Sequence, residues 1–359
     1  SFLEQADSTT ALTLKTNELY TFKHREKLPN AIPFSNPYWL NEKHEIGTYR
    51  IADASLIGKP ENDAAANVFF NISINDLNLR IERGLGYKYT DPVKGEVYRP
   101  FEVLPPATVN IPEKVFVFTD AAPKSIFITV KANTANVNGT LSVKGTEGWN
   151  ISIKNPEFKL TSKNDEAIIE AMITATKGAK DGKLEASVSI NNISYHKSIK
   201  RMEYDHIPYQ FILSDAEAGL VNIDLKKTGV NIGYIPGAGD DVPAALKQIG
   251  YNVTVLTDEL LSNENLSKYN AIVSGVRAYN TNDRLQVHYA RLMDYVKNGG
   301  NLVVQYNTNN RIGPVVAKIG PYPFTISRDR VTNEKAEVNF SNAKHSALNF
   351  PNVITPKDF

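Results

Sequence analysis

The chain has 359 residues, a formal net charge of +1 at pH 7 and no cysteine. An apolar fraction of 42% and a charged fraction of 22% are ordinary for globular proteins, and a chain of this length is expected to hold more than one domain. The near-neutral charge argues against nucleic acid as a partner. Without cysteine, the chain forms no disulfide, zinc–thiolate site or iron–sulfur cluster and has no cysteine nucleophile.

No apolar run reaches the roughly 18 residues that a membrane-spanning helix needs. The N-terminal run SFLEQADSTT has neither a basic nor an apolar segment, so it does not resemble a signal peptide. It also lacks an initiating methionine. We interpret the sequence as the interior of a longer protein or as a trimmed chain.

The first part of the chain, residues 1–118, has an all-β pattern. Between Asn67 and Asp91, apolar residues recur at every second position on both sides of Asn75-Asp76, which predicts a β-hairpin with its turn at that pair. We expect this region to form a β-sandwich domain.

Residues 119–205 contain short β-type runs at fairly even spacing, separated by Gly and Asn. This spacing is typical of an immunoglobulin-like sandwich, although the Cys…Trp…Cys pattern of antibody domains is absent. Trp149 is expected in the core or at its rim, and Asn138-Gly139 is expected to form a tight hairpin turn. Arg201 to Ser214 is expected to link this sandwich to the next domain.

Residues 206–359 are expected to form a flavodoxin-like α/β domain. The order strand, helix, strand, loop, strand, helix, strand implies parallel strands with helices on both faces. The predicted strands are Val230–Ile235, Tyr251–Leu256, Ala271–Gly275 and Leu302–Tyr306, and the predicted helices are Val242–Ile249 and Leu285–Val296. The pattern weakens after Tyr306, so the sheet is expected to be incomplete at its C-terminus. Ligands of such sheets bind at the carboxyl ends of the strands.

The loop Gly237-Ala238-Gly239-Asp240-Asp241 joins the first predicted strand to a helix. A phosphate could bind there, but the third glycine of the dinucleotide motif is missing and two carboxylates would repel an anion. The favoured role of these carboxylates is to cap the helix, with Pro243 in its first turn. A contact from Asp240 to a sugar hydroxyl or a cation stays open.

The turn after the third predicted strand reads Ser274-Gly275-Val276-Arg277-Ala278-Tyr279-Asn280. Related architectures place a nucleophile on such a turn, but Arg277 is neither a nucleophile nor a proton carrier at neutral pH. Two roles are open for Arg277: a clamp on a ligand carboxylate, or an ion pair with Asp240 or Asp241. Tyr279 and Asn280 are candidate ligand-binding residues beside it.

A polar run from Tyr306 to Arg311 leaves the fourth predicted strand at the same edge. Its amides, among them those of Asn307 and Asn309, are candidates for binding sugar hydroxyls, and an ordinary solvated loop is the alternative. The run Arg328-Asp329-Arg330 either folds back over this edge or lies on the open surface.

The histidines are scattered and lack the spacing of metal ligands, so we predict no metal site and no cofactor. They are His24, His44, His196, His206, His288 and His345. No Ser/His/Asp set is recognisable from spacing alone, although such a set can be assembled in space.

Several runs along the chain together carry a resemblance to a known protein family. They are YDHIPYQ (204–210), IGYIPGAGDDVPAALKQIGYNVTVL (232–256), GVRAYNTND (275–283), GGNLVVQYNT (299–308), GPYPFTISRDRVT (320–332), PYWL (37–40), LIGKPEN (56–62) and DPVKGEVYRPFEVLPP (91–106). Together they resemble the region that follows the catalytic domain in large PIG-L (LmbE-like) deacetylase family proteins of Bacteroidetes-type bacteria. The middle sandwich resembles NEW3-type modules of carbohydrate-active enzymes, and the last domain resembles a class I glutamine amidotransferase-like domain.

The resemblance implies a carbohydrate setting but carries no catalytic residue into this chain. PIG-L deacetylases are zinc hydrolases that act on N-acetylglucosamine-type substrates through an H-P-D-D run and a distant His. The Asp-Asp pair of this chain, Asp240-Asp241, follows Gly239 and not His-Pro. Amidotransferases place a cysteine on the elbow near which Arg277 stands, and the chain has no cysteine.

We therefore expect a non-catalytic accessory region that binds a glycan or amino sugar, or that packs on a missing N-terminal catalytic domain. A periplasmic or extracellular location follows from the resemblance alone. Two alternatives stay open: an independent hydrolase with an unrecognised site at the strand ends, and a purely structural spacer.

Overall fold

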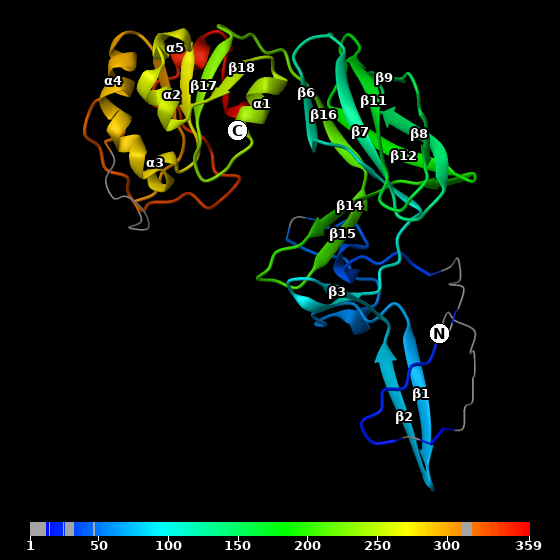
Figure 1. Ribbon diagram of the computed structural model, residues 1–359. Helices are drawn as coiled ribbons and strands as arrows, with labels where there is room; N and C mark the ends of the chain where they lie inside the picture. The colour runs from blue at the N-terminus through cyan, green and yellow to red at the C-terminus, as the bar shows by residue number, and fades with distance from the viewer. Residues whose placement is uncertain (1–11, 14, 24, 26–31, 46, 310–317) are drawn as a thin grey trace.

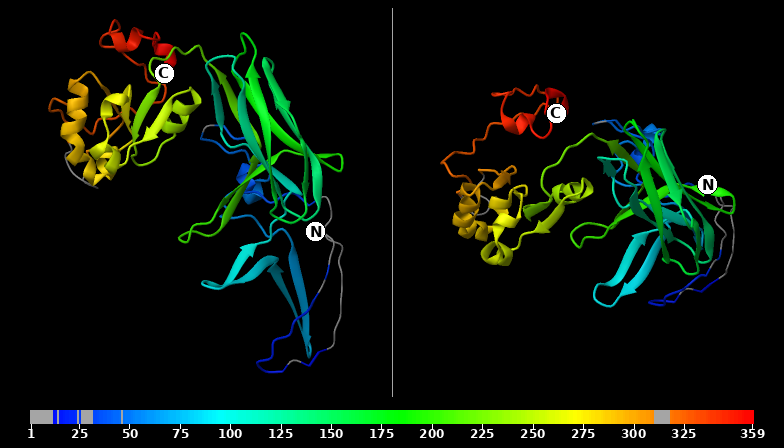
Figure 2. Two further views of the ribbon diagram at one scale, coloured as in Figure 1. Left: turned by 45° about the horizontal axis from the view of Figure 1, so that its top comes forward. Right: turned by 90° about the horizontal axis from the view of Figure 1, so that it is seen from above.

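The computed structural model describes residues 12–309 and 318–359, with the exception of 14, 24, 26–31 and 46 (Figure 1). The described chain is mostly β structure arranged in several sheets, and one of these sheets is parallel and is covered by helices. Along the chain, projecting hairpins come first, a pair of packed sheets follows, and the parallel sheet comes last (Figures 1 and 2).

Two sheets pack face to face in the middle of the chain and enclose its largest core. One sheet has the order β5-β7-β11-β9, and the other has the order β10-β8-β12-β16-β6 with β13 paired to β12. The strands are β5 (Ala107–Asn110), β6 (Val115–Phe118), β7 (Lys124–Ala132), β8 (Val137–Gly145), β9 (Trp149–Ile153), β10 (Glu157–Leu160), β11 (Glu166–Ala175), β12 (Gly182–Ile190), β13 (Ile193–Tyr195) and β16 (Glu217–Asn222).

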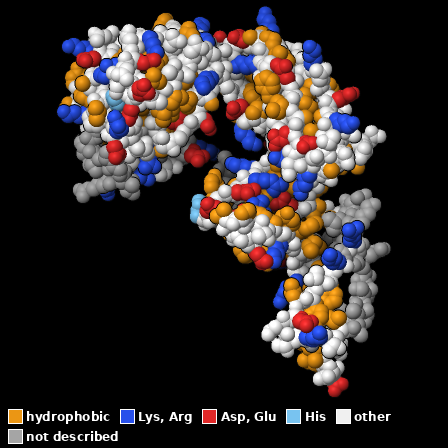
Figure 3. Space-filling model, in the orientation of Figure 1, with side chains coloured by type: hydrophobic (Ala, Val, Ile, Leu, Met, Phe, Trp, Pro, Cys, Tyr) orange, Lys and Arg blue, Asp and Glu red, His pale blue; other side chains and the backbone are white. Residues whose placement is uncertain are grey.

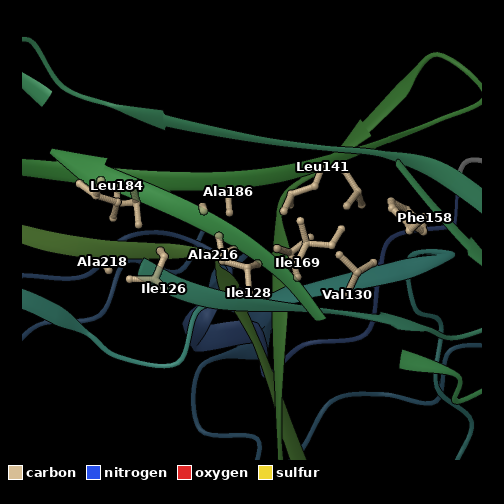
Figure 4. Packing of buried hydrophobic residues seen from close by; sticks show 14 of the residues in the cluster. Ile126, Ile128, Val130, Leu141, Phe158, Ile169, Leu184, Ala186, Ala216 and Ala218 are labelled. Carbon is tan, nitrogen blue, oxygen red and sulfur yellow. The ribbon is translucent and has the colours of Figure 1, made fainter. Parts of the chain in front are cut away.

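The core of this sandwich follows from the period-two pattern of its strands. In β7, Ile126 and Ile128 point inward while Phe127 between them is exposed, because successive side chains of a strand face opposite sides. Figure 4 shows the inward residues of both sheets meeting in one layer. Each fully buried aliphatic side chain here contributes roughly 1.5–3 kcal/mol. Trp149 lies in this core, as predicted, and its indole N–H donates to the Lys180 carbonyl at 2.9 Å.

The sandwich differs from the predicted one in two respects. Its strands span 107–222, a wider range than the predicted 119–205, because β5, β6 and β16 pair into the same two sheets. The predicted turn at Asn138-Gly139 is wrong, because both residues lie inside β8. A Cβ at Gly139 would meet the Ser189 carbonyl oxygen at 2.4 Å, so this glycine serves a close approach of neighbouring strands.

As far as the described residues show, the N-terminal part contains two hairpins and two short 3₁₀ segments, Tyr38–Leu40 and Ala54–Leu56, and not a second sandwich. The hairpins are β1 (Asn67–Ile74) with β2 (Leu77–Gly84) and β3 (Gly86–Asp91) with β4 (Gly95–Pro100). The predicted turn at Asn75-Asp76 is confirmed, and Asn75 takes the positive φ of 53° that such a turn requires. Within the described chain, no aliphatic or aromatic side chain before Ala107 is fully buried, apart from the proline ring of Pro105.

The predicted linker at Arg201–Ser214 is instead a third hairpin. It pairs β14 (Lys197–Met202) with β15 (Gln210–Asp215). The backbone N–H of Leu213 in this hairpin donates to the side chain of Asn36 at 2.9 Å, which ties it to the N-terminal part. The actual link to the parallel sheet is the stretch 223–230, which follows β16.

The β1–β2 hairpin has one polar face and one apolar face. Its register places seven large apolar side chains on the same face: Val68, Phe70, Ile72, Ile74, Leu77, Leu79 and Ile81. Phe70 remains 42% exposed and Leu79 remains 41% exposed. Figure 3 shows hydrophobic side chains on this projecting end of the molecule. An apolar sheet face of this kind typically marks an interaction surface.

The C-terminal part contains the predicted parallel sheet, in the order β18-β17-β19-β20. Its elements are β17 (Asn231–Ile235), α1 (Val242–Gln248), β18 (Asn252–Val255), α2 (Asp258–Asn263), η3 (Leu266–Lys268), β19 (Ala271–Ser274), α3 (Ala278–Thr281), η4 (Asp283–His288), α4 (Tyr289–Lys297), β20 (Asn301–Val304), α5 (Ser346–Asn349) and η5 (Pro356–Asp358). Helix α1 packs on one face, and α2 and α4 pack on the other. The predicted second helix begins as the 3₁₀ segment η4 before α4.

A stability comparison tests the difference between the hairpin face and the sandwich core. We expect Phe70→Ser to change the free energy of unfolding by less than about 1 kcal/mol, because the ring is half in solvent. Leu184→Ala, at a fully buried position of β12, should cost about 2–5 kcal/mol. Scanning calorimetry of the sandwich transition measures both. An equal loss from the two substitutions would mean that the hairpin face is packed in the intact chain.

Candidate functional site at the strand ends

The carboxylate of Asp240 is bound by groups from three segments of the sheet's carboxyl edge. The Tyr234 hydroxyl donates to it at 2.7 Å, and the backbone N–H groups of Val276 and Val242 donate to it at 3.0 Å each. Gln305 donates at 3.5 Å from the end of β20. Burial alone would raise the pKa of Asp240, but these hydrogen bonds outweigh it and hold the pKa below its usual value.

Asp240 therefore has a structural role at this edge, and a contact from its carboxylate to a sugar hydroxyl or a cation stays a prediction. Helix capping is also served by Asp240, through Val242, while the side chain of the N-cap residue Asp241 makes no cap hydrogen bond. Asp241 is exposed to solvent.

The glycine-rich loop packs against the turn after β19 and is not an open phosphate loop. A Cβ at Gly237 would lie 2.1 Å from the Val276 carbonyl oxygen, and a Cβ at Gly275 would lie 2.4 Å from the Tyr234 hydroxyl. The Ala238 N–H donates to the same Val276 carbonyl at 2.7 Å. The sheet order reverses between β17 and β19, where ligands of such sheets usually bind. Here the backbone itself occupies that crevice.

Arg277 stands on the strand-to-helix turn, as predicted, in the left-handed conformation with φ 57° and ψ 24°. A non-glycine residue there costs of order 1–3 kcal/mol, which the surrounding structure must offset. Within the described residues, the ion pairs of the C-terminal part are Lys268–Glu264, Arg284–Asp258 and His288–Asp258, and none includes Arg277. The buried Nε atom of Arg277 has no hydrogen-bond partner among the described groups. Of the two roles left open for Arg277, the ion pair with Asp240 or Asp241 is therefore not formed.

The turn that contains Arg277 is hydrogen-bonded to the chain leaving β20. The Arg277 N–H donates to the Tyr306 carbonyl at 2.6 Å, and the Tyr279 N–H donates to the side-chain oxygen of Asn307 at 3.1 Å. The side-chain amide of Asn280 pairs with the backbone of Thr308 in both directions, at 2.9 and 2.8 Å. These bonds set the path of residues 306–309.

A hollow of about 590 Å³ opens where this chain leaves β20. One wall consists of Tyr306, Thr308 and Asn309, and the other is the run 327–332. The side-chain amide of Asn309 donates to the Ile326 carbonyl at 3.0 Å and joins the two walls. The run Arg328-Asp329-Arg330 thus lies at this edge of the sheet, which was one of the two predicted possibilities.

The predicted site residues divide into a structural group and an available group. The side chains of Asp240, Asn280 and Asn307 form hydrogen bonds within the protein, and Asn307 is only 6% exposed. Tyr279 is 3% exposed, and burial raises the pKa of its hydroxyl to about 12. Arg277 keeps a buried Nε atom without a hydrogen-bond partner among the described groups, and Asp241 is exposed. Asn309 lines the hollow, although its amide also donates to the Ile326 carbonyl.

The hollow contains residues that sequence reasoning did not select as ligand-binding, chiefly Tyr306, Arg328 and Arg330. Tyr306 is 61% exposed and lies two residues after the end of β20, a strand that is itself only partly buried. The sequence feature that could have indicated this wall is the polar run 327–332, which follows a proline-rich stretch. Because this run is far from Tyr306 along the chain, the sequence did not show that the two segments line one hollow.

A buried His–carboxylate pair also occurs, away from this hollow. The Nε2 atom of His288 lies 3.3 Å from Asp258, whose other oxygen pairs with Arg284 at 2.7 Å. No serine or threonine hydroxyl is hydrogen-bonded to His288 among the described contacts.

Within the described residues, no group of three or more His, Asp or Glu side chains is close enough to hold a metal ion. None of the helices described is both long and apolar enough to cross a membrane.

The close approach at Gly237 gives a direct test of the closed crevice. Gly237→Ala should destabilise the C-terminal part by roughly 1–3 kcal/mol, because its Cβ meets backbone that cannot rotate away. Gly320→Ala is the matched control, since its Cβ would make only ordinary contacts, with the Phe324 ring at 3.4 Å and the Tyr322 carbonyl oxygen at 3.9 Å. Urea unfolding followed by helical circular dichroism measures both variants. Equal stability would mean that the two loops are not in contact.

The lowered pKa of Asp240 gives a pH signature. Its stabilisation should be complete above the unfolded-state pKa of about 3.9 and should disappear as the pH falls through the lower folded-state pKa. Asp240→Asn should therefore cost roughly 1–3 kcal/mol at pH 7, and the gap to the parent protein should close towards pH ~2. Unfolding free energies measured across this range test it. A gap independent of pH would exclude an ionised, hydrogen-bonded Asp240.

Comparison with known proteins gives little guidance. No family model matches the sequence, and a search of curated proteins finds no relative. A FixG-related protein from Vibrio parahaemolyticus is 10% identical over 33% of this chain and 98% of its own, with a TM-score of 0.22. The C. elegans protein WR4, of the MSP family, is 10% identical to this chain. The match covers 32% of this chain and 98% of WR4, with a TM-score of 0.20. A Bacteroides ovatus xyloglucanase is 11% identical to this chain. The match covers 55% of this chain and 45% of the xyloglucanase, with a TM-score of 0.18. Scores this low carry no argument about fold or function.

Proposed function

We propose that this chain is a non-catalytic accessory region of a PIG-L-type deacetylase family protein, and that the hollow at the end of β20 binds a glycan. The observation that carries the proposal is the composition of that hollow. An exposed aromatic ring, Tyr306, stands among hydroxyl and amide groups on a fixed backbone. Aromatic rings supply an apolar platform, and the polar groups around them fix the orientation of a ligand.

The finer description of the fold belongs to the same proposal. The middle sandwich is of immunoglobulin-like, NEW3-like type, and the parallel sheet is of flavodoxin-like, amidotransferase-like type without a catalytic cysteine. The strand order β18-β17-β19-β20 supports the second assignment, because a flavodoxin-like sheet begins with the same arrangement. The protein then acts in the periplasm or outside the cell, where a carbohydrate-directed family would meet its glycans.

The N-terminal hairpin supports a further part of the proposal, contact with a catalytic domain. Its face of seven apolar side chains is unusual on an isolated surface and fits a protein partner that would cover it. The missing N-terminal catalytic domain is the partner that we propose. An independent hydrolase is less favoured, because the carboxylate at the strand ends, Asp240, is already engaged by two backbone N–H groups.

A binding measurement tests the glycan proposal. Tyr306→Ala should weaken binding of chito-oligosaccharides and their deacetylated forms by about tenfold or more, since loss of an aromatic contact is worth about 1–3 kcal/mol in comparable stacked sites. Tyr322→Ala is the matched control, because Tyr322 is 80% exposed and lies outside the hollow. Titration calorimetry with the whole chain provides the readout. Absence of binding to any saccharide would favour the spacer alternative.

A further inference from the structure

The hollow at the end of β20 carries more positive than negative charge. Two guanidinium groups, from Arg328 and Arg330, line it together with one carboxylate, from Asp329. Both arginines are exposed, and neither belongs to the ion pairs found among the described residues of the C-terminal part. Elsewhere in this part, the cations Lys268 and Arg284 do have carboxylate partners. The chain as a whole carries only +1, so the excess is local.

The two walls of the hollow are built structures and not independent loops. The wall of Tyr306 is fixed by the bond from the Arg277 N–H, at 2.6 Å, and by the Asn280–Thr308 amide pair. The arginine wall is joined to it through Asn309 and the Ile326 carbonyl. The hydroxyl of Ser327 accepts from the Asp329 N–H at 3.1 Å, which orders the turn that bears the arginines. The Arg277 turn thus holds the backbone of Tyr306, whose side chain lines the same hollow as Arg328 and Arg330.

Guanidinium groups and an exposed ring recognise different parts of one ligand. A guanidinium offers paired N–H donors that match a carboxylate or a sulfate, whereas a neutral sugar leaves such donors without an anionic partner. A tyrosine ring packs against the apolar face of a sugar. The volume of about 590 Å³ is within the usual range of small-ligand sites.

We propose that this hollow selects saccharides that carry an anionic group, and that Arg328 and Arg330 contact the anion while Tyr306 contacts the sugar ring. The inference rests on the proposed glycan binding and adds the charge of the ligand to it. Carboxylated sugars and sulfated sugars share this chemistry, and the experiment distinguishes the two sources.

The experiment compares anionic with neutral saccharides, and its central pair is trigalacturonate and its methyl ester, which have the same sugar rings. Trigalacturonate, its fully methyl-esterified form and N-acetylglucosamine 6-sulfate are titrated into the whole chain by calorimetry, with neutral chitotriose alongside. We expect an anionic ligand to bind at least about tenfold more tightly than its neutral counterpart, as one additional charge-assisted hydrogen bond would give. The preference should decrease when salt rises from roughly 0.05 to 0.5 M, because solvent-exposed charges are screened.

Matched variants assign the preference to the hollow. Arg328→Gln with Arg330→Gln should remove the difference between trigalacturonate and its ester. Lys335→Gln with Lys344→Gln removes the same charge from exposed positions outside the hollow and should leave the difference intact. Circular dichroism confirms that both double variants are folded, as expected for exposed side chains.

Each outcome has a distinct meaning. Equal binding of trigalacturonate and its ester overturns the charge selectivity and leaves the proposed glycan binding in place. A preference that survives the Arg328/Arg330 double substitution shows that other residues contact the anion, which overturns the inference for this hollow. Tight binding of the sulfated sugar together with weak binding of trigalacturonate supports the inference and identifies sulfate as the anion. No binding of any of the four saccharides to the folded chain overturns both proposals.

Discussion

The C-terminal part depends on one ionised side chain held by backbone amides. The carboxylate of Asp240 accepts from Val242, where the loop after β17 enters α1, and from Val276, in the loop after β19. Gly237 allows these loops to approach, because any Cβ there would overlap the Val276 carbonyl. The result is a filled crevice at the point where the sheet order reverses. A ligand site at this edge must therefore lie farther along the sheet, towards β20.

The hydrogen bonds of the next turn explain where that site lies. Residues that look like ligand-binding groups in the sequence, Asn280 and Asn307, instead join the Arg277 turn to the exit of β20. Their amides satisfy backbone groups that would otherwise be buried without partners. The same turn holds the backbone of Tyr306, whose exposed side chain lines one hollow together with the arginine run. The polar residues that hold the backbone, Asn280 and Asn307, are thus close in the chain or in space to residues that line the hollow. Both groups are needed to form the hollow.

The two ends of the molecule present surfaces of opposite character. The β1–β2 hairpin offers an apolar sheet face with half-exposed rings, whereas the end of β20 offers a polar and cationic hollow. The sandwich between them holds the largest core and is hydrogen-bonded to the C-terminal part. The side-chain amide of Gln248, at the end of α1, accepts from the Val117 N–H and donates to the Val115 carbonyl in β6. An apolar surface suits a protein neighbour, and a charged hollow suits a small polar ligand, so the two ends support different parts of one accessory function.

The sequence by itself determined the parallel sheet, the hairpin turn at Asn75-Asp76 and the sandwich strands, because periods of two and of about 3.6 residues, with Gly and Asn at the turns, are local properties. It also placed Arg277 on the turn after β19. Only the tertiary structure decided that Asp240 and Asn307 are hydrogen-bonded internally, that β5 and β16 join one sandwich, and that Arg328 and Tyr306 line one hollow. Each of these depends on contacts between residues far apart in the chain, and local residue patterns do not specify which distant backbone groups a side chain will meet.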